Sequence, residues 1–166
     1  MQIRIRTSGA VMYEDEFRRL NPSTSFPQQI SEATLNDFGA DVVFEGPQAS
    51  GGTVYQYSQA AGVEQISGKW YTKHILGPVF TDTTVEGVTT TALEHETAYK
   101  ASKDADQAKS VRTSRDAKLK ECDWTQLDDT PLSNTVKATW AIYRQALRDV
   151  TTQAGFPWTI TWPDAP

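Results

Sequence analysis

The chain has 166 residues, of which 38% are hydrophobic and 22% are charged, and its net charge is −5. This length allows one domain or two small ones, and the modest hydrophobic content leaves only a small core for each. Residues 1–82 carry 6 basic and 9 acidic groups, residues 83–121 carry 7 of each, and residues 122–166 carry 3 and 5. No segment has the excess of positive charge that binding to a phosphate backbone requires, so nucleic acid is not expected as a partner.

Cys122 is the single cysteine of the chain, which excludes an internal disulfide and a metal site made of cysteines alone. We expect a reduced residue near a helix end, with an intermolecular disulfide as the alternative. The first nine residues, MQIRIRTSG, lack the apolar stretch of a secretory signal, and no run approaches the roughly 20 apolar residues of a membrane span. The sequence therefore predicts a protein made in a cytosol, without a membrane partner.

Residues 1–82 are expected to form a small α+β head domain. Residues 2–6 alternate apolar and charged side chains, as in a strand with one buried face. One short helix is predicted over residues 13–20 and another after Ser31, a suitable N-cap. Further strands are predicted in the segments 41–44, 53–58 and 69–76, with a hairpin turn at Ser67–Gly68.

We find no catalytic or metal-binding constellation in the sequence. His74 lies in a predicted strand and His95 in a predicted helix, with no cysteine near either, and both are expected to be structural or solvent-facing. The segment GPQASGG at residues 46–52 lacks the Lys-Ser/Thr pair of a phosphate-binding loop. The chain is therefore not expected to be an enzyme, and no cofactor or metal is expected.

Residues 83–91, rich in threonine, are expected to be a linker to one long helix over residues 92–121, which contain no Gly or Pro. Such a helix is about 45 Å long at 1.5 Å per residue. Four alanines follow a 3–4 spacing that permits close approach of another helix: Ala98, Ala101, Ala105 and Ala108. Two interpretations stay open, a solvated single helix held at its ends or a stalk packed against a second copy or another protein.

Residues 122–166, with the end of the long helix, are expected to form an antiparallel helical hairpin followed by an extended aromatic tail. Ser133 is a suitable N-cap for the second helix. The apolar side chains of that helix form one stripe: Val136, Trp140, Tyr143, Leu147 and Val150. After Gly155-Phe156-Pro157, an extended tail can place three alternating apolar side chains on one face: Trp158, Ile160 and Trp162.

The tryptophans of this hairpin suggest a binding face. A hairpin this small is expected to have difficulty covering four of them alone, and Trp, Tyr and Arg are favoured interface anchors. The competing interpretation is that the aromatic stripe is simply core, as such stripes usually are. The candidate partner-binding residues are Trp124, Trp140, Tyr143, Arg144, Arg148, Trp158 and Trp162, with Ala101 and Ala105.

Several strings in this region carry a resemblance to a known family. They are Arg115-Asp116 with Lys120, DWTQL at residues 123–127, Trp140 with YRQALRDV at residues 143–150, and Gly155-Phe156-Pro157. With these strings, residues 110–163 or so resemble the C-terminal module of bacteriophage tail assembly chaperone proteins, which recurs in short phage proteins encoded near tail-fibre genes. The head more loosely resembles phage tail-fibre assembly proteins and small proteins of marine cyanophages.

The resemblance implies a non-enzymatic viral protein that binds phage tail or tail-fibre subunits, in multiple copies. The expected location is the virion tail, after synthesis in the host cytoplasm. The first hypothesis is a structural protein retained in the virion, and the alternative is a transient assembly chaperone that mature particles lack. A carbohydrate-binding or cell-wall-acting protein is a remote alternative without a positive signal beyond aromatic content.

Overall fold

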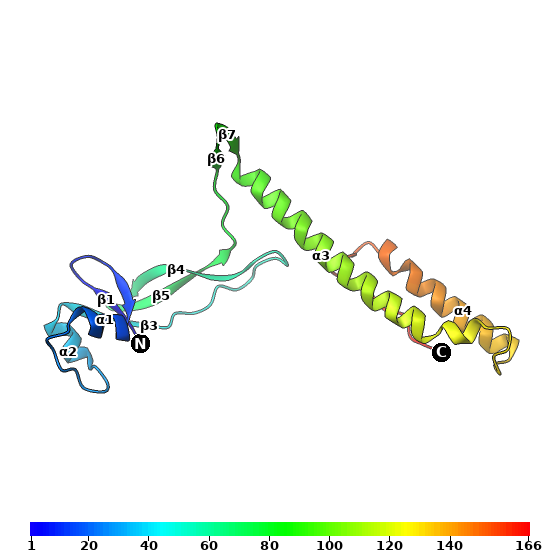
Figure 1. The fold of residues 1–166 in the computed structure, drawn as a ribbon, viewed down its shortest axis with the longest axis horizontal. Coiled ribbons are helices and arrows are strands. Elements are labelled where there is room, and N and C mark those ends of the chain that lie inside the picture. Colours follow the sequence, from blue (N-terminus) through cyan, green and yellow to red (C-terminus); the bar gives the residue numbers. More distant parts are fainter. The chain divides into compact units, whose positions relative to one another are not determined.

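The computed structural model describes residues 1–166 and divides them into two compact units, Met1–Val79 and Phe80–Pro166. The fold mixes a five-stranded sheet and a two-stranded sheet with four α-helices and two 3-10 helices. Figure 1 shows the five-stranded sheet and the short helices in the first unit, and the two-stranded sheet and the long helices in the second. The predicted α+β class is confirmed.

The sheet of the first unit has the strand order β2-β1-β3-β5-β4. Its strands are β1 (Gln2–Ile5), β2 (Val11–Tyr13), β3 (Ala40–Phe44), β4 (Tyr57–Ile66) and β5 (Lys69–Gly77). All neighbours are antiparallel except β3 and β5, which pair in parallel through Val43–Trp70 and Phe44–Tyr71. The two long strands β4 and β5 therefore form a hairpin that meets the rest of the sheet over a short ladder.

Two short helices cover one face of this sheet, α1 (Glu14–Leu20) and α2 (Glu32–Asp37). The core consists of Ile3, Phe17, Ile30, Leu35 and Ala40, all less than 7% exposed. Ile3 points into this core because the alternation of β1 gives it one buried face. The hydroxyl of Ser31 accepts a hydrogen bond from the backbone N–H of Thr34 and so caps α2, as its position in the sequence suggests.

The second unit begins with a two-stranded antiparallel ribbon, β6 (Thr83–Val85) and β7 (Val88–Thr90). Glu86 and Gly87 connect the strands with φ angles of 50° and 81°, the backbone of a tight turn whose twist matches a hairpin. Residues 83–91, expected to be a linker, thus contain ordered β-structure. The Thr84 and Thr89 hydroxyls lie 2.9 Å apart across the ribbon.

Two α-helices make up most of the second unit, α3 (Ala92–Glu121) and α4 (Asn134–Asp149). Two 3-10 helices flank α4, η1 (Asp123–Gln126) and η2 (Val150–Thr152). In α3 the Thr91 hydroxyl and the Glu94 carboxylate form a capping box, and the Ser133 hydroxyl caps α4. Figure 1 shows α4 alongside the second half of α3, running in the opposite direction.

Candidate interaction surface

The interior of the second unit lies where the C-terminal half of α3 meets α4. Cys122, Tyr143 and Leu147 form its buried cluster, and three partly buried side chains pack against them, those of Leu119, Trp140 and Trp162. Leu147 is 0% exposed, and burial of a leucine side chain stabilises a fold by about 1.5–3 kcal/mol. Tyr143 is also buried, which raises the pKa of its hydroxyl, and Cys122 and Glu121 add to this rise. Tyr143 therefore belongs to the core.

Arg144 fastens α4 to the end of α3. Its Nη2 lies 2.7 Å from Asp123 Oδ1, and its Nη1 donates to the Leu119 carbonyl oxygen at 2.8 Å and to Cys122 Sγ at 3.1 Å. The Leu119 carbonyl lies in the last turn of α3, where it accepts the Cys122 N–H at 3.2 Å and where the helix dipole attracts a cation. Burial alone lowers the pKa of Arg144, but the hydrogen bonds to Asp123 and Cys122 outweigh it and raise the pKa.

The segment after α4 lies along α3. Trp158 Nε1 donates to Asp104 Oδ1 at 2.5 Å, and Lys118 Nζ lies 5.6 Å from the centre of the Trp162 ring. The Gln153 side chain holds the segment through hydrogen bonds with both the N–H and the carbonyl oxygen of Thr161. A Cβ at Gly155 would lie 2.1 Å from the Thr159 carbonyl oxygen, so this bend requires glycine.

Both tail tryptophans are therefore half-buried against the chain's own helix. Trp158, Ile160 and Trp162 are partly buried, whereas the intervening Thr159 and Thr161 are exposed. Trp158 itself lies in a turn, in which the backbone N–H groups of Trp158 and Thr159 both donate to the Gly155 carbonyl oxygen at 3.0 and 2.7 Å.

Apolar side chains remain exposed at the end of the unit where η1 connects α3 to α4. Trp124 is 48% exposed, Leu127 54% and Val136 39%, and we call these three residues the connector patch. Two hydrogen bonds fix the backbone beneath them, from Lys137 Nζ to the Leu127 carbonyl oxygen at 2.7 Å and from Gln126 Nε2 to the Lys137 carbonyl oxygen at 3.3 Å. Because this backbone is already fixed, a partner that covers these side chains does not have to order it on binding.

The nine candidate residues separate into three groups in the structure. Tyr143 and Arg144 are internal, and Trp140, Trp158 and Trp162 are half-buried. Exposed positions are occupied by Trp124, Arg148, Ala101 and Ala105. Ala101 and Ala105 lie before Ala108, the first buried residue of α3, so they are not brought together with the tryptophans of the connecting end.

Leu127 and Val136 belong to the connector patch but are absent from the sequence-based candidates. Leu127 is the last residue of the DWTQL string, and Val136 is the first residue of the α4 stripe. Their position in the sequence could have identified them, because both lie at the end of an apolar pattern. Residues at the ends of an amphipathic stripe extend beyond the element that covers its middle.

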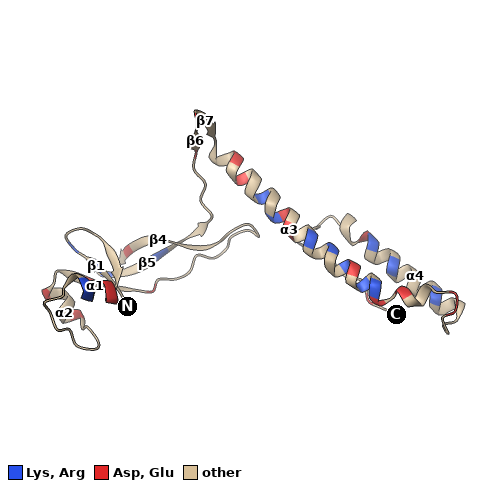
Figure 2. Cartoon of the chain, viewed as in Figure 1, with Lys and Arg blue, Asp and Glu red and all other residues tan.

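The second half of α3 and α4 contain charged residues of both signs. Figure 2 shows basic residues along the second half of α3 and on α4, with acidic residues among them. Residues 108–166 contain eight basic and seven acidic side chains, so the unit has no strong field of one sign. Recognition of a partner here depends on apolar contact more than on long-range attraction.

The two histidines have neighbours within their own units. His74 Nε2 lies 3.2 Å from Gln48 Nε2 and 3.7 Å from Glu45 Oε1, and His95 Nε2 lies 2.7 Å from the Thr83 hydroxyl. The structure contains no group of three or more His, Cys, Asp and Glu side chains placed to hold a metal ion. None of its helices combines the length and apolar character needed to cross a membrane.

Residues 108–166 match the family model of the phage tail assembly chaperone protein. This match confirms the resemblance predicted for the C-terminal module, and it covers about a third of the chain. It begins at the first buried residue of α3 and includes η1, α4 and the tail. No curated protein and no solved structure matches the chain.

Proposed function

We propose that the chain is a non-enzymatic phage tail protein whose C-terminal module binds a tail or tail-fibre subunit. The observation that carries this proposal is the family match, which includes the buried cluster of the second unit. Residues 108–166 match the phage tail assembly chaperone family, and they contain Cys122, Tyr143 and Leu147 of that cluster. A family match that includes the packed part of a unit supports a shared functional module.

Within this module, the connector patch is the proposed contact region for the partner. Trp124 is an exposed aromatic side chain of η1, Leu127 and Val136 are exposed aliphatic ones, and fully desolvated aromatic residues dominate the binding energy of protein interfaces. Arg144 and Tyr143 hold the backbone of this end in place from within. In this proposal they are positioning residues, and Trp124, Leu127 and Val136 contact the partner.

Our first hypothesis is that the protein is retained in the virion as a structural part of the tail, after synthesis in the host cytoplasm. The head over residues 1–82 then serves one attachment and the C-terminal module another, connected by residues 83–121. Tails are symmetric assemblies, so multiple copies are expected. The family's description as an assembly chaperone favours the second candidate, a transient factor that covers a fibre or tail surface and is absent from mature particles.

Quantitative mass spectrometry of purified particles of the encoding phage distinguishes these two candidates. A fixed number of copies per particle, commensurate with the tail symmetry, supports the structural role. Absence from particles together with abundance in the infected-cell lysate supports the transient role. Absence of any complex with a tail or fibre protein in that lysate would overturn both.

The connector patch is tested by affinity capture from the same lysate with the full chain and with two variants. Trp124→Ala removes an exposed aromatic side chain of the patch and is expected to weaken capture of the tail protein about tenfold or more. Ile142→Ala is the matched control, because Ile142 is 71% exposed outside the patch. Equal capture by both variants would place the contact elsewhere.

A further inference from the structure

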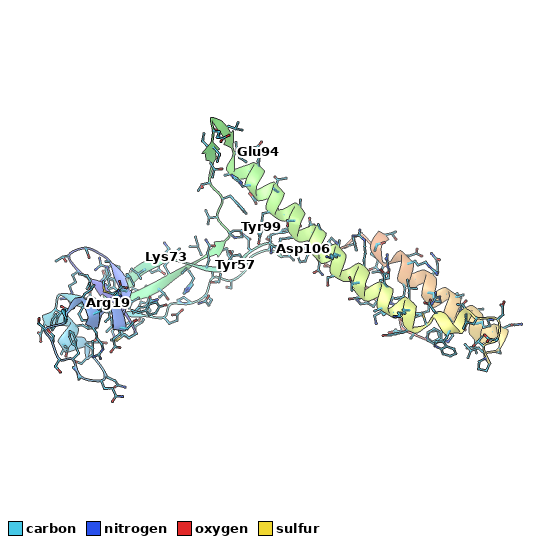
Figure 3. All side chains as sticks on the ribbon, viewed as in Figure 1. Arg19, Tyr57, Lys73, Glu94, Tyr99 and Asp106 are labelled. Atoms are coloured by element: carbon cyan, nitrogen blue, oxygen red, sulfur yellow. The ribbon has the colours of Figure 1, made fainter.

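The outer edge of β4 has no partner strand within the sheet. β4 is the last strand of the five-stranded sheet, and eight of its ten residues pair with β5, whereas Ala61 and Gly62 lie in a bulge. Figure 3 labels Tyr57, at the start of β4, and Lys73 on β5. Exposed edges are usually protected by Lys, Pro, a bulge or a covering element; β4 has this one bulge, but its sequence YSQAAGVEQI contains no Lys or Pro and Glu64 is its single charge. Alternate backbone N–H and C=O groups on this edge are therefore available to another strand.

The register with β5 determines which side chains of β4 share a face. Tyr57 and Gln59 lie opposite Gly77 and Ile75, whereas Ala60 lies opposite His74 on the other face. A bulge between Ala60 and Val63 inserts one extra residue, so Val63, opposite Thr72, returns to the face of Ala60. Glu64 and Ile66 consequently share the face of Tyr57 and Gln59.

We infer that this edge pairs with the β4 strand of a second copy of the chain, antiparallel, about a two-fold axis between Ala61 and Gly62. In this register Tyr57 lies opposite Ile66 of the second copy, and Gln59 lies opposite Glu64. Ala60 lies opposite Val63 on the other face. Each pair occurs twice because the contact is isologous.

The chemistry of these pairs identifies a second copy as the occupant. Tyr57 and Ile66 are 54% and 46% exposed, and an aromatic–β-branched pair is among the favourable cross-strand contacts. The Gln59 amide can donate to the Glu64 carboxylate, so the single charge of each edge gains a hydrogen bond. No like charges face each other in this register.

Neighbouring registers lack this match. A shift of one residue places Ser58 opposite Ile66, which lie on different faces of the sheet. A shift of two residues places Gln59 opposite Ile66 and leaves Tyr57 beyond the end of the partner strand. One contact of ten residues per copy is small, so the dimer is expected to be reversible and dependent on concentration.

Sedimentation velocity of the full chain between about 5 and 500 µM tests the pairing, since this range brackets micromolar affinity. The wild type is expected to change from monomer to dimer across this range. Tyr57→Lys with Ile66→Lys places like charges opposite each other twice and is expected to raise Kd about tenfold or more. Tyr57→Glu with Ile66→Lys places opposite charges there and is expected to restore Kd to within about threefold of the wild type.

Val11→Lys is the matched control, because Val11 is 40% exposed on β2, at the other edge of the same sheet. It should leave Kd unchanged, and circular dichroism melts of all variants should show an intact fold. A wild-type chain that stays monomeric over the whole range would overturn the inference. The remaining candidate for pairing with this edge would then be a strand of another protein. A dimer that both charge variants weaken equally, or that neither weakens, would overturn it as well.

Discussion

The two halves of α3 are held in different ways, although they belong to one uninterrupted helix. In the C-terminal half, Ala108 and Val111 are buried, and Arg144 and the tail bind along it. No residue from 92 to 107 is buried. Apart from the hydrogen bond of Asp104 with Trp158 of the tail, this first half is held by contacts nearer in the sequence: the capping box of Thr91 and Glu94, the Glu96–Lys100 ion pair at 2.6 Å and the contact of Phe80 with Tyr99.

The difference shows where the free energy of a long helix comes from. A short α4 of 16 residues can cover only part of a 30-residue partner, so tertiary packing stabilises only that part. The uncovered half depends on propensity, on caps and on surface pairs that contribute a few tenths of a kcal/mol each. We therefore expect the N-terminal half to open at lower free energy than the C-terminal half.

Leu147→Ala is expected to have the largest effect, because it empties the centre of the covered half. Leu147 is 0% exposed, and such a truncation costs about 2–5 kcal/mol of unfolding free energy. Urea denaturation followed by tryptophan fluorescence measures it. Ile142→Ala, on the exposed side of the same helix, should change the free energy by less than about 0.5 kcal/mol.

Trp158→Phe tests whether the tail holds α3 at Asp104, just before the covered half begins at Ala108. The change removes the N–H that donates to Asp104 and keeps an aromatic ring, and a hydrogen bond to a charged group contributes about 1.5–3 kcal/mol. We expect urea denaturation to show this loss of unfolding free energy, and amide hydrogen exchange near residue 104 to become faster. Unchanged exchange there would show that the tail is not held along α3 in solution.

Thr91→Ala tests whether the N-terminal half of α3 depends on its own cap. Loss of the N-cap is expected to cost about 1 kcal/mol, and the effect should appear locally as faster hydrogen exchange over residues 93–98. Exchange in residues 111–121 should not change. A uniform increase along the helix would contradict the division into two halves.

The smallest expected effect is a pH dependence at Glu94. The backbone N–H and the hydroxyl of Thr91 both donate to this carboxylate and lower the pKa of Glu94 below its ordinary value of 4.5. Because the folded pKa is depressed, the cap stabilises the helix fully above the unfolded pKa and is lost as the pH falls through the lower, folded value. An NMR titration of the Glu94 carboxyl should show this shift, and Thr91→Ala should return the pKa toward 4.5.

Local patterns predicted part of this molecule well. The alternation around Ile3 and the N-caps Ser31 and Ser133 are encoded within a few residues, and the structure forms them as expected. The strings from Arg115 to Pro157 likewise indicated the family whose model matches residues 108–166. These signals need no knowledge of what lies across the fold.

The remaining features depend on contacts between distant residues. Arg144 is a typical interface residue by composition, but in the structure it binds Asp123 and the Leu119 carbonyl, 21 and 25 positions away. The spacing of Ala101 and Ala105 suggests a packed seam, but both are exposed, and the buried residues of α3 are Ala108 and Val111.

The buried thiol of Cys122 can report how often the end of α3 separates from α4. Its thiol is the only one in the chain and is 3% exposed, so an alkylating reagent reaches it only when the end of α3 separates from α4. The rate of labelling under native conditions thus measures the frequency of that separation, without any introduced probe. Protection of this thiol in the presence of a captured tail protein would show that binding tightens the same end of the module.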